Sequence, residues 1–123
     1  MNYYNIDVLL GKVWDRVFQD GESIVFENSK ERVTFLHHQD CCEHVYIESI
    51  VGELSDLEGV PLSVAEEVSH IDPEAYESGT WTFYKFAGRG WVDVRWYGSS
   101  NGYYGEGVST VHEYLSEPEQ LED

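Results

Sequence analysis

Short segments in which apolar and polar residues alternate recur along this chain. Alternation with a period of two predicts β-strands with one buried face. The segments are residues 13–18, 23–27, 32–36, 80–86, 91–97 and 103–115. Turn-forming residues separate several of them: Asp20-Gly21, Asn28-Ser29-Lys30 and Gly88-Arg89-Gly90. The order of strands and tight turns predicts antiparallel hairpins.

Two apolar segments are less specific. Residues 45–51 fit a strand or a helix, and residues 61–68 favour a strand. In the segment 52–59, Leu54 and Leu57 lie three residues apart, which fits one helical turn or a loop. We therefore expect an α+β protein that is mainly antiparallel β-sheet, with about six to eight short strands and one or two short helices. Residues 1–115 would form a single globular domain, and residues 116–123 an acidic, flexible tail.

Composition and charge narrow the function classes. The chain is 41% hydrophobic and 15% aromatic, which argues against a disordered protein, yet its formal net charge is −17. Such a charge repels nucleic acids and anionic membranes and attracts basic protein surfaces, so we expect a protein partner and no direct binding to nucleic acid or membrane. Acidic charge also serves solubility alone, and that alternative stays open. The N-terminus lacks a signal-peptide pattern and no apolar run is long enough to span a bilayer, so we expect a cytoplasmic protein.

The acidic residues are unevenly distributed. No Lys or Arg occurs between Val33 and Tyr84, whereas eleven carboxylates do. The candidate residues for binding a basic partner are Glu48, Glu53, Asp56 and Glu58.

Residues 37–44 contain both cysteines of the chain and three of its five histidines. Imidazole and thiolate together favour zinc, and the candidate ligands here are His38, Asp40, Cys41 and Cys42, with Glu67 from a later segment. The zinc would be structural. Two alternatives are a buried cysteine pair beside hydrogen-bonded histidines, and Cys/His catalysis, for which the neighbouring residues offer no recognised context. We expect reduced thiols, because a disulfide between adjacent residues is strained, and we expect no enzyme activity.

A second group of candidates lies in the segment 80–102. Trp81, Lys85, Arg95 and Asn101 could stack a base and hold a phosphate on one face of a hairpin. Alternatively, the aromatic residues of this hairpin belong to the core.

Several motifs spread over most of the chain resemble a family of small, mostly uncharacterised phage and prophage proteins. They are Leu10-Gly11-Lys12, His38-Gln39-Asp40-Cys41-Cys42-Glu43, residues 59–62, 65–67 and 77–85, and Val92-Asp93-Val94-Arg95-Trp96-Tyr97 with its extension to Tyr104. The resemblance implies an accessory phage gene, among which inhibitors of host immunity such as acidic anti-CRISPR proteins are frequent.

We therefore expect a phage-encoded, non-enzymatic inhibitor in the cytoplasm of the infected bacterium. It would bind a host CRISPR effector nuclease, of type II, through its acidic face and block DNA loading. The alternative is a nucleotide-binding sponge that sequesters a bacterial immune signal.

Overall fold

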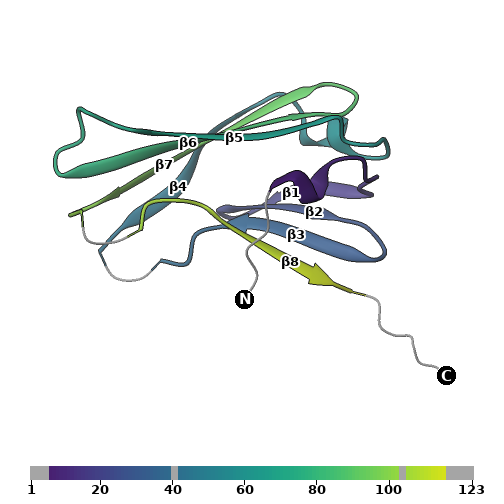
Figure 1. The fold of residues 1–123 in the computed structure, drawn as a ribbon, viewed down its shortest axis with the longest axis horizontal. Coiled ribbons are helices and arrows are strands. Elements are labelled where there is room, and N and C mark those ends of the chain that lie inside the picture. Colours follow the sequence, from purple (N-terminus) through teal and green to yellow (C-terminus); the bar gives the residue numbers. More distant parts are fainter. Residues whose placement is uncertain (1–5, 40–41, 103–104, 116–123) are drawn as a thin grey trace.

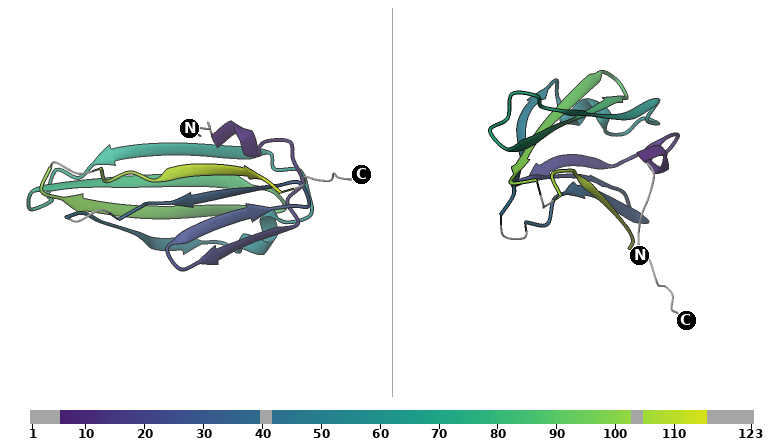
Figure 2. Two further views of the ribbon diagram at one scale, coloured as in Figure 1. Left: turned by 90° about the horizontal axis from the view of Figure 1, so that it is seen from below. Right: turned by 60° about the vertical axis from the view of Figure 1, so that its left-hand side comes forward.

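The computed structural model describes residues 6–39, 42–102 and 105–115. Eight strands form two four-stranded antiparallel sheets that stack as two layers (Figures 1 and 2). The strands are β1 (Arg16–Asp20), β2 (Ser23–Glu27), β3 (Glu31–Leu36), β4 (His44–Val51), β5 (Val64–Ile71), β6 (Ser78–Ala87), β7 (Trp91–Ser100) and β8 (Ser109–Tyr114). One sheet has the order β1-β2-β3-β8 and the other the order β4-β7-β6-β5. The fold is a β-sandwich.

The helical part of the fold prediction is wrong. The described residues contain no α-helix, only two four-residue 3₁₀ turns, η1 (Ile6–Leu9) and η2 (Leu54–Leu57). Leu54 and Leu57 do mark a helical turn, and Leu57 is fully buried. The turn ends there because Gly59 adopts a positive φ of 77° and its amide donates to the carbonyl of Trp14. The class is therefore all-β.

The turns between the first three strands follow the sequence. Asp20 lies opposite Ser23, and Gly21 between them has a φ of 60°, which glycine adopts without strain. At the next turn the side-chain Oδ1 of Asn28 accepts hydrogen bonds from the amides of Lys30 and Glu31. Asparagine is favoured at this position because its side chain replaces a backbone acceptor.

Aromatic rings from both sheets form the core. Phe26 of β2 packs against Phe86 of β6 with ring centroids 5.1 Å apart, and Phe35 of β3 lies 4.9 Å from Tyr84 of β6. Such edge-on and tilted pairs add to the stabilisation from burial alone. Trp14 and Trp96 are the two largest fully buried side chains.

Strand β7 is longer than its sequence suggests. Residues 98–102 look like a loop, but β7 continues to Ser100 and Gly98 lies inside it, opposite Val45. A Cβ atom on Gly98 would lie 2.3 Å from the carbonyl oxygen of Glu106. The glycine therefore permits a close backbone approach within a regular strand.

The predicted tail, residues 116–123, lies outside the described residues. Within the described part of the chain, no helix has the length and apolar character needed to cross a membrane.

Candidate functional site: the outer aromatic face

The side chains on the outer face of the β4-β7-β6-β5 sheet form rows across the strands. In one row, Tyr46 pairs with Tyr97, and Tyr97 pairs with Trp81. In the next row, Arg95 pairs with Phe83. Directly opposite residues in antiparallel strands point to the same side of a sheet. We call these five residues, Tyr46, Trp81, Phe83, Arg95 and Tyr97, the outer aromatic face.

The rings of this face contact one another. Trp81 and Tyr97 have centroids 4.6 Å apart, and Trp81 stacks on Phe83 at 6.1 Å with planes only 13° apart. The guanidinium carbon of Arg95 lies 6.0 Å from the Trp81 ring and 5.7 Å from the Phe83 ring. The row from Tyr46 through Tyr97 to Trp81 crosses the adjacent strands β4, β7 and β6, so it is roughly 10 Å wide at the usual strand spacing. The result is a partly exposed aromatic platform with a cation on it.

Tyr97 is held in place by its neighbours. Its hydroxyl donates a 2.8 Å hydrogen bond to Oδ2 of Asp72, and this bond, with burial, raises the pKa of Tyr97 to about 12. The ring lies over Gly79, where a Cβ atom would be 2.2 Å from the Tyr97 hydroxyl oxygen. Glycine at residue 79 therefore makes room for a fixed tyrosine. A side chain already held in one conformation loses less entropy when it binds a partner.

The charges around the platform are mixed. Arg95 forms an exposed ion pair with Glu48 at 3.7 Å. Lys85 lies between Glu66 of β5 and Asp93 of β7, directly opposite both. Two cations therefore face three carboxylates, so the platform does not offer the excess positive charge that polyanion binding needs.

The four residues proposed for nucleotide binding are only partly brought together. Trp81 and Arg95 are neighbours on the platform, and Lys85 is two residues from Phe83 on the same strand. Phe83, Lys85 and Arg95 line a shallow recess of about 250 Å³. Asn101 lines a different hollow of about 540 Å³ at the end of the sheet, with Tyr97. In the loop beside this hollow, the backbone amide of Gly102 already donates a hydrogen bond to the Ser100 hydroxyl.

The four carboxylates proposed for partner binding divide into two groups. Glu48 and Glu53 are exposed. Glu58 instead accepts a 2.8 Å hydrogen bond from the amide of Val17, which joins η2 to β1. Asp56 is half-buried, and its carbonyl accepts from the amide of Arg89. The Glu58 carboxylate therefore braces the fold, whereas Asp56 does so through its backbone.

Two of the predicted metal ligands, Asp40 and Cys41, lie outside the described residues. His38 is exposed, and Cys42 is disulfide-bonded. The expectation of a free thiol at Cys42 is therefore wrong, and a disulfide sulfur has no thiolate to offer a metal. Glu67 lies on β5, at the opposite edge of the sheet from β4, and accepts a hydrogen bond from the Tyr84 hydroxyl. In the described ranges, no three His, Cys, Asp or Glu residues gather as a metal site.

His37, which was not among the predicted ligands, has a structural role. Its Nδ1 lies 2.8 Å from the carbonyl oxygen of Gly107, and its Nε2 lies 2.9 Å from Oε2 of Glu43. Both ring nitrogens thus have hydrogen-bond partners within the fold. The Glu43 side chain is 2% exposed, so this pair anchors the connection between β3 and β4.

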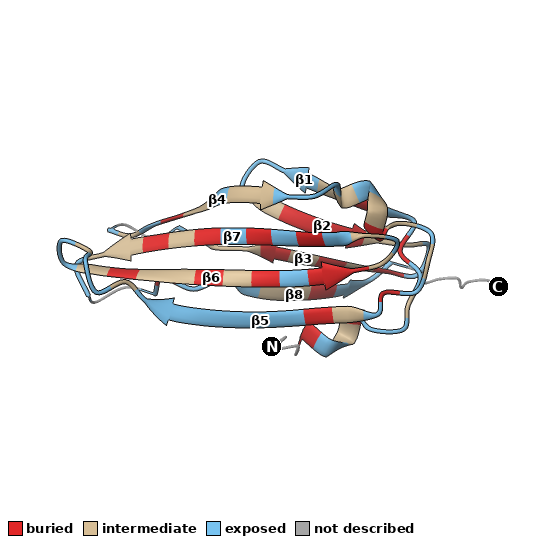
Figure 3. Cartoon of the chain, turned by 90° about the horizontal axis from the view of Figure 1, so that it is seen from above, coloured by how far each residue is buried: buried red, intermediate tan, exposed pale blue. Residues whose placement is uncertain are grey.

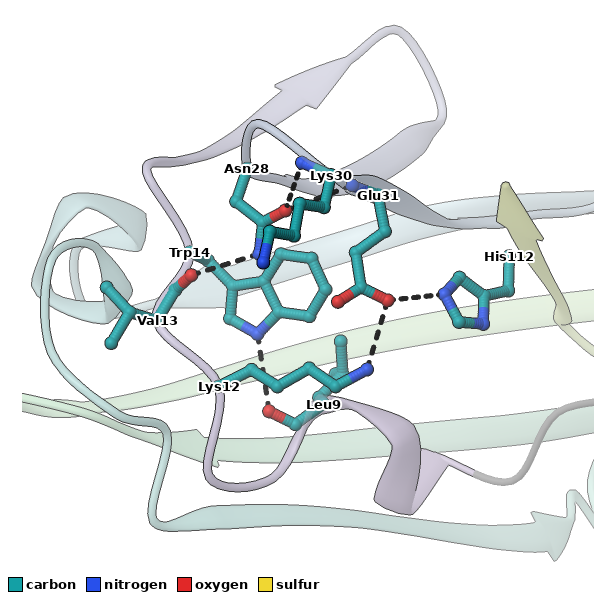
Figure 4. Close-up of polar contacts among 8 residues, drawn as sticks. All are labelled: Leu9, Lys12, Val13, Trp14, Asn28, Lys30, Glu31 and His112. Atoms are coloured by element: carbon teal, nitrogen blue, oxygen red, sulfur yellow. Dashed lines mark hydrogen bonds and ion pairs between the residues drawn. The ribbon is translucent and has the colours of Figure 1, made fainter. Parts of the chain in front are cut away.

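Two buried carboxylates were not found from the sequence. Glu31 accepts hydrogen bonds from Lys12 at 3.0 Å and from His112 at 2.6 Å (Figure 4). Glu106 accepts from the hydroxyls of Thr80 and Ser100. Burial alone would raise the pKa of each carboxyl, but the hydrogen bonds lower both pKa values overall. Neither position has a local sequence signal, because Lys12, His112 and Thr80 lie far from these carboxylates along the chain.

Comparison with protein families identifies a match over most of the sandwich. A family model described as "Domain of unknown function (DUF7448)" matches residues 7–110. The chain belongs to this family. The matched DUF7448 region begins in η1 and reaches into β8, so it contains every residue of the outer aromatic face. No curated protein matches the chain. No solved structure matches it either.

Proposed function

We propose that this DUF7448 protein is a non-enzymatic binding protein that docks onto a basic protein surface through its outer aromatic face. The observation that carries the proposal is the platform of Trp81, Phe83 and Tyr97 with Arg95 lying over the rings. Tryptophan, tyrosine and arginine are the residues most enriched at the energetic centres of protein interfaces. Carboxylates at the rim and a net charge of −17 favour a partner rich in Lys and Arg.

The finer part of the proposal concerns the partner. A host defence nuclease of the CRISPR type, which holds nucleic acid on a basic surface, has the required charge. The resemblance of the sequence motifs to phage accessory proteins supports this choice. Occupying the nucleic-acid channel would then block DNA loading.

The test uses purified CRISPR effectors of type II, preassembled on guide RNA, with DNA cleavage and biolayer interferometry as readouts. Trp81→Ala and Arg95→Ala should each weaken binding by about thirtyfold, because truncation at an interface centre costs about 2 kcal/mol or more. The matched control is Arg16→Ala, because Arg16 forms a similar cation–π pair with Phe18, at 4.4 Å, on β1 of the other sheet. Equal binding by all three variants, or no inhibition of any effector, would contradict the proposal.

The second candidate is a nucleotide sponge that uses the same platform. Trp81 and Arg95 favour it, since an aromatic ring with an adjacent guanidinium can stack a base and contact a phosphate. Calorimetry against cyclic and ADP-ribose-type nucleotides separates the two candidates. Micromolar binding that Arg95→Ala abolishes and Glu53→Lys leaves intact would favour the sponge.

We also keep structural zinc as a proposal for the segment around His38. Elemental analysis of protein purified under reducing conditions without chelators should find about one zinc per chain, and chelation should lower thermal stability. His38→Ala should release the metal, whereas His70→Ala, at an exposed histidine on β5, should retain it. Less than about 0.2 zinc per chain in folded, reduced protein would rule the site out.

A further inference from the structure

Strand β5 differs from the other three sheet edges. Edge strand β4 contains a bulge between Ile47 and Ser49, and the amide of Ile47 donates to Oε1 of Glu22, which covers that edge. Strands β1 and β8 are only five and six residues long. Strand β5 instead pairs all eight of its residues with β6 without a register shift. Bulges and short length are usual protections of an edge, and β5 has neither among the described residues; the charge that it carries is that of Glu66 and Glu67.

Most of β5 is uncovered. Its last six residues, Glu66 to Ile71, are all exposed, and most of β5 is pale blue in Figure 3. Val68 and Ile71 expose 50% and 81% of their surface. The first two residues, Val64 and Ala65, are less exposed, and η1 packs against the strand. Exposed apolar side chains on a regular, unpaired edge are the features of a strand that pairs with another chain.

We propose that β5 pairs antiparallel with β5 of a second copy of this chain, with Val68 opposite Val68. The two sandwiches would share one continuous eight-stranded sheet. This inference does not depend on the proposed function of the outer aromatic face.

Geometry limits the possible registers. A two-fold axis perpendicular to the sheet keeps the outer faces of both copies on one side. Because side chains alternate along a strand, an even-numbered residue must then lie opposite an even-numbered residue of the second copy, and an odd-numbered residue opposite an odd-numbered one. The axis must then pass through a residue pair. If the axis passed through Glu67, the Glu67 residues of the two copies would lie opposite each other. If it passed through Ser69, Glu66 would lie opposite Asp72 of the second copy. Both registers place like charges opposite each other, which is destabilising.

Centring the axis on Val68 avoids these conflicts. Each Glu66 then faces His70 of the second copy, and each Glu67 faces Ser69. The imidazole N–H of His70 can donate to a carboxylate in either protonation state. His70 is already positioned on this face by its edge-to-face contact with Phe83, with centroids 5.9 Å apart. The pairing would place the two outer aromatic faces side by side on one surface.

Sedimentation over a concentration series to about 0.5 mM tests the pairing. The parent protein should approach twice the chain mass of 14.2 kDa. Association should strengthen from 0.05 to 0.5 M NaCl, because salt screens the repulsion between two acidic chains. His70→Glu should weaken association about tenfold, since it replaces two attractive cross-strand pairs by two repulsive ones. The exchange Glu66→His with His70→Glu should restore it to within about threefold of the parent.

Gln19→Glu adds the same charge to the edge strand β1 and should leave association unchanged. Circular dichroism of each variant checks folding. If His70→Glu alone unfolds the chain, the double exchange Glu66→His with His70→Glu still tests the pairing. A parent that stays monomeric throughout would overturn the proposal. Two other results would also overturn it: His70→Glu dimerising as tightly as the parent, or Trp81→Ala preventing dimerisation. Either result would place the contact elsewhere.

Discussion

Replacing Glu31 by Gln tests the buried ion network in Figure 4. The Glu31 side chain is 11% exposed and that of His112 is 1% exposed, whereas Lys12 keeps 35%. The substitution preserves shape and removes the charge from both hydrogen bonds. Hydrogen bonds to a charged group are worth about 1.5–3 kcal/mol each, but Lys12 can turn to water, which offsets part of the loss. We therefore expect Glu31→Gln to lower the free energy of unfolding by about 2 kcal/mol at pH 7.

The effect of Glu31→Gln should depend on pH. The folded-state pKa of Glu31 lies below its ordinary value of 4.5, so the carboxylate stabilises the fold above that pH. This contribution is lost as the pH falls through the folded-state pKa. Urea unfolding followed by circular dichroism from pH 7 to pH 3.5 should therefore show the gap between parent and variant shrinking.

The control for this prediction is Glu113→Gln. Glu113 is 50% exposed and pairs with Arg32 at the surface, so its replacement should cost less than about 0.5 kcal/mol at any pH. A Glu31→Gln variant as stable as the parent at pH 7, or a gap that widens in acid, would show that the Glu31 carboxylate does not stabilise the fold in this way.

Two further predictions concern the stability of the fold. Gly98→Ala should destabilise the fold by about 2–3 kcal/mol in urea unfolding, because the new methyl would collide with the backbone of Glu106, whereas Gly107→Ala, with nothing within 4 Å, should be nearly neutral. Glu58→Lys should lower the thermal midpoint by several degrees because it removes the hydrogen bond to the β1 backbone, whereas Glu53→Lys, at an exposed position, should not. A stable Glu58→Lys variant would return that residue to the candidates for partner binding.

Local features of the fold could be predicted from the sequence. Alternation located the strands at 23–27 and 91–97, and the Asp20-Gly21 and Asn28 turns formed where expected. These signals depend on neighbouring residues only. The division of the strands between two sheets depends on contacts between distant residues, such as the pairing of β3 with β8, and no local pattern encodes it.

The candidate site shows the same division. The placement of Trp81, Phe83 and Arg95 on one exposed face is one of the two alternatives that alternation within the hairpin left open. The place of Tyr46 beside Tyr97 could not be predicted, because it depends on the pairing of β4 with β7 and on a bulge that changes its register. Alternation also could not decide which aromatic residues form the core: Tyr84 and Phe86 are buried, whereas Phe83, the residue before Tyr84, faces outward.

The four tryptophans give this protein an intrinsic optical signal for its own surface. Trp14 and Trp96 are fully buried, whereas Trp91 is 61% exposed and Trp81 lies on the outer aromatic face. Fluorescence quenching by acrylamide therefore acts mainly on the second pair, and Lys85, 5.7 Å from the Trp91 ring, marks the same surface. A partner that covers the platform would protect Trp81 from the quencher without altering the emission of Trp14 or Trp96. Docking on this sheet is thus measurable with the unlabelled protein.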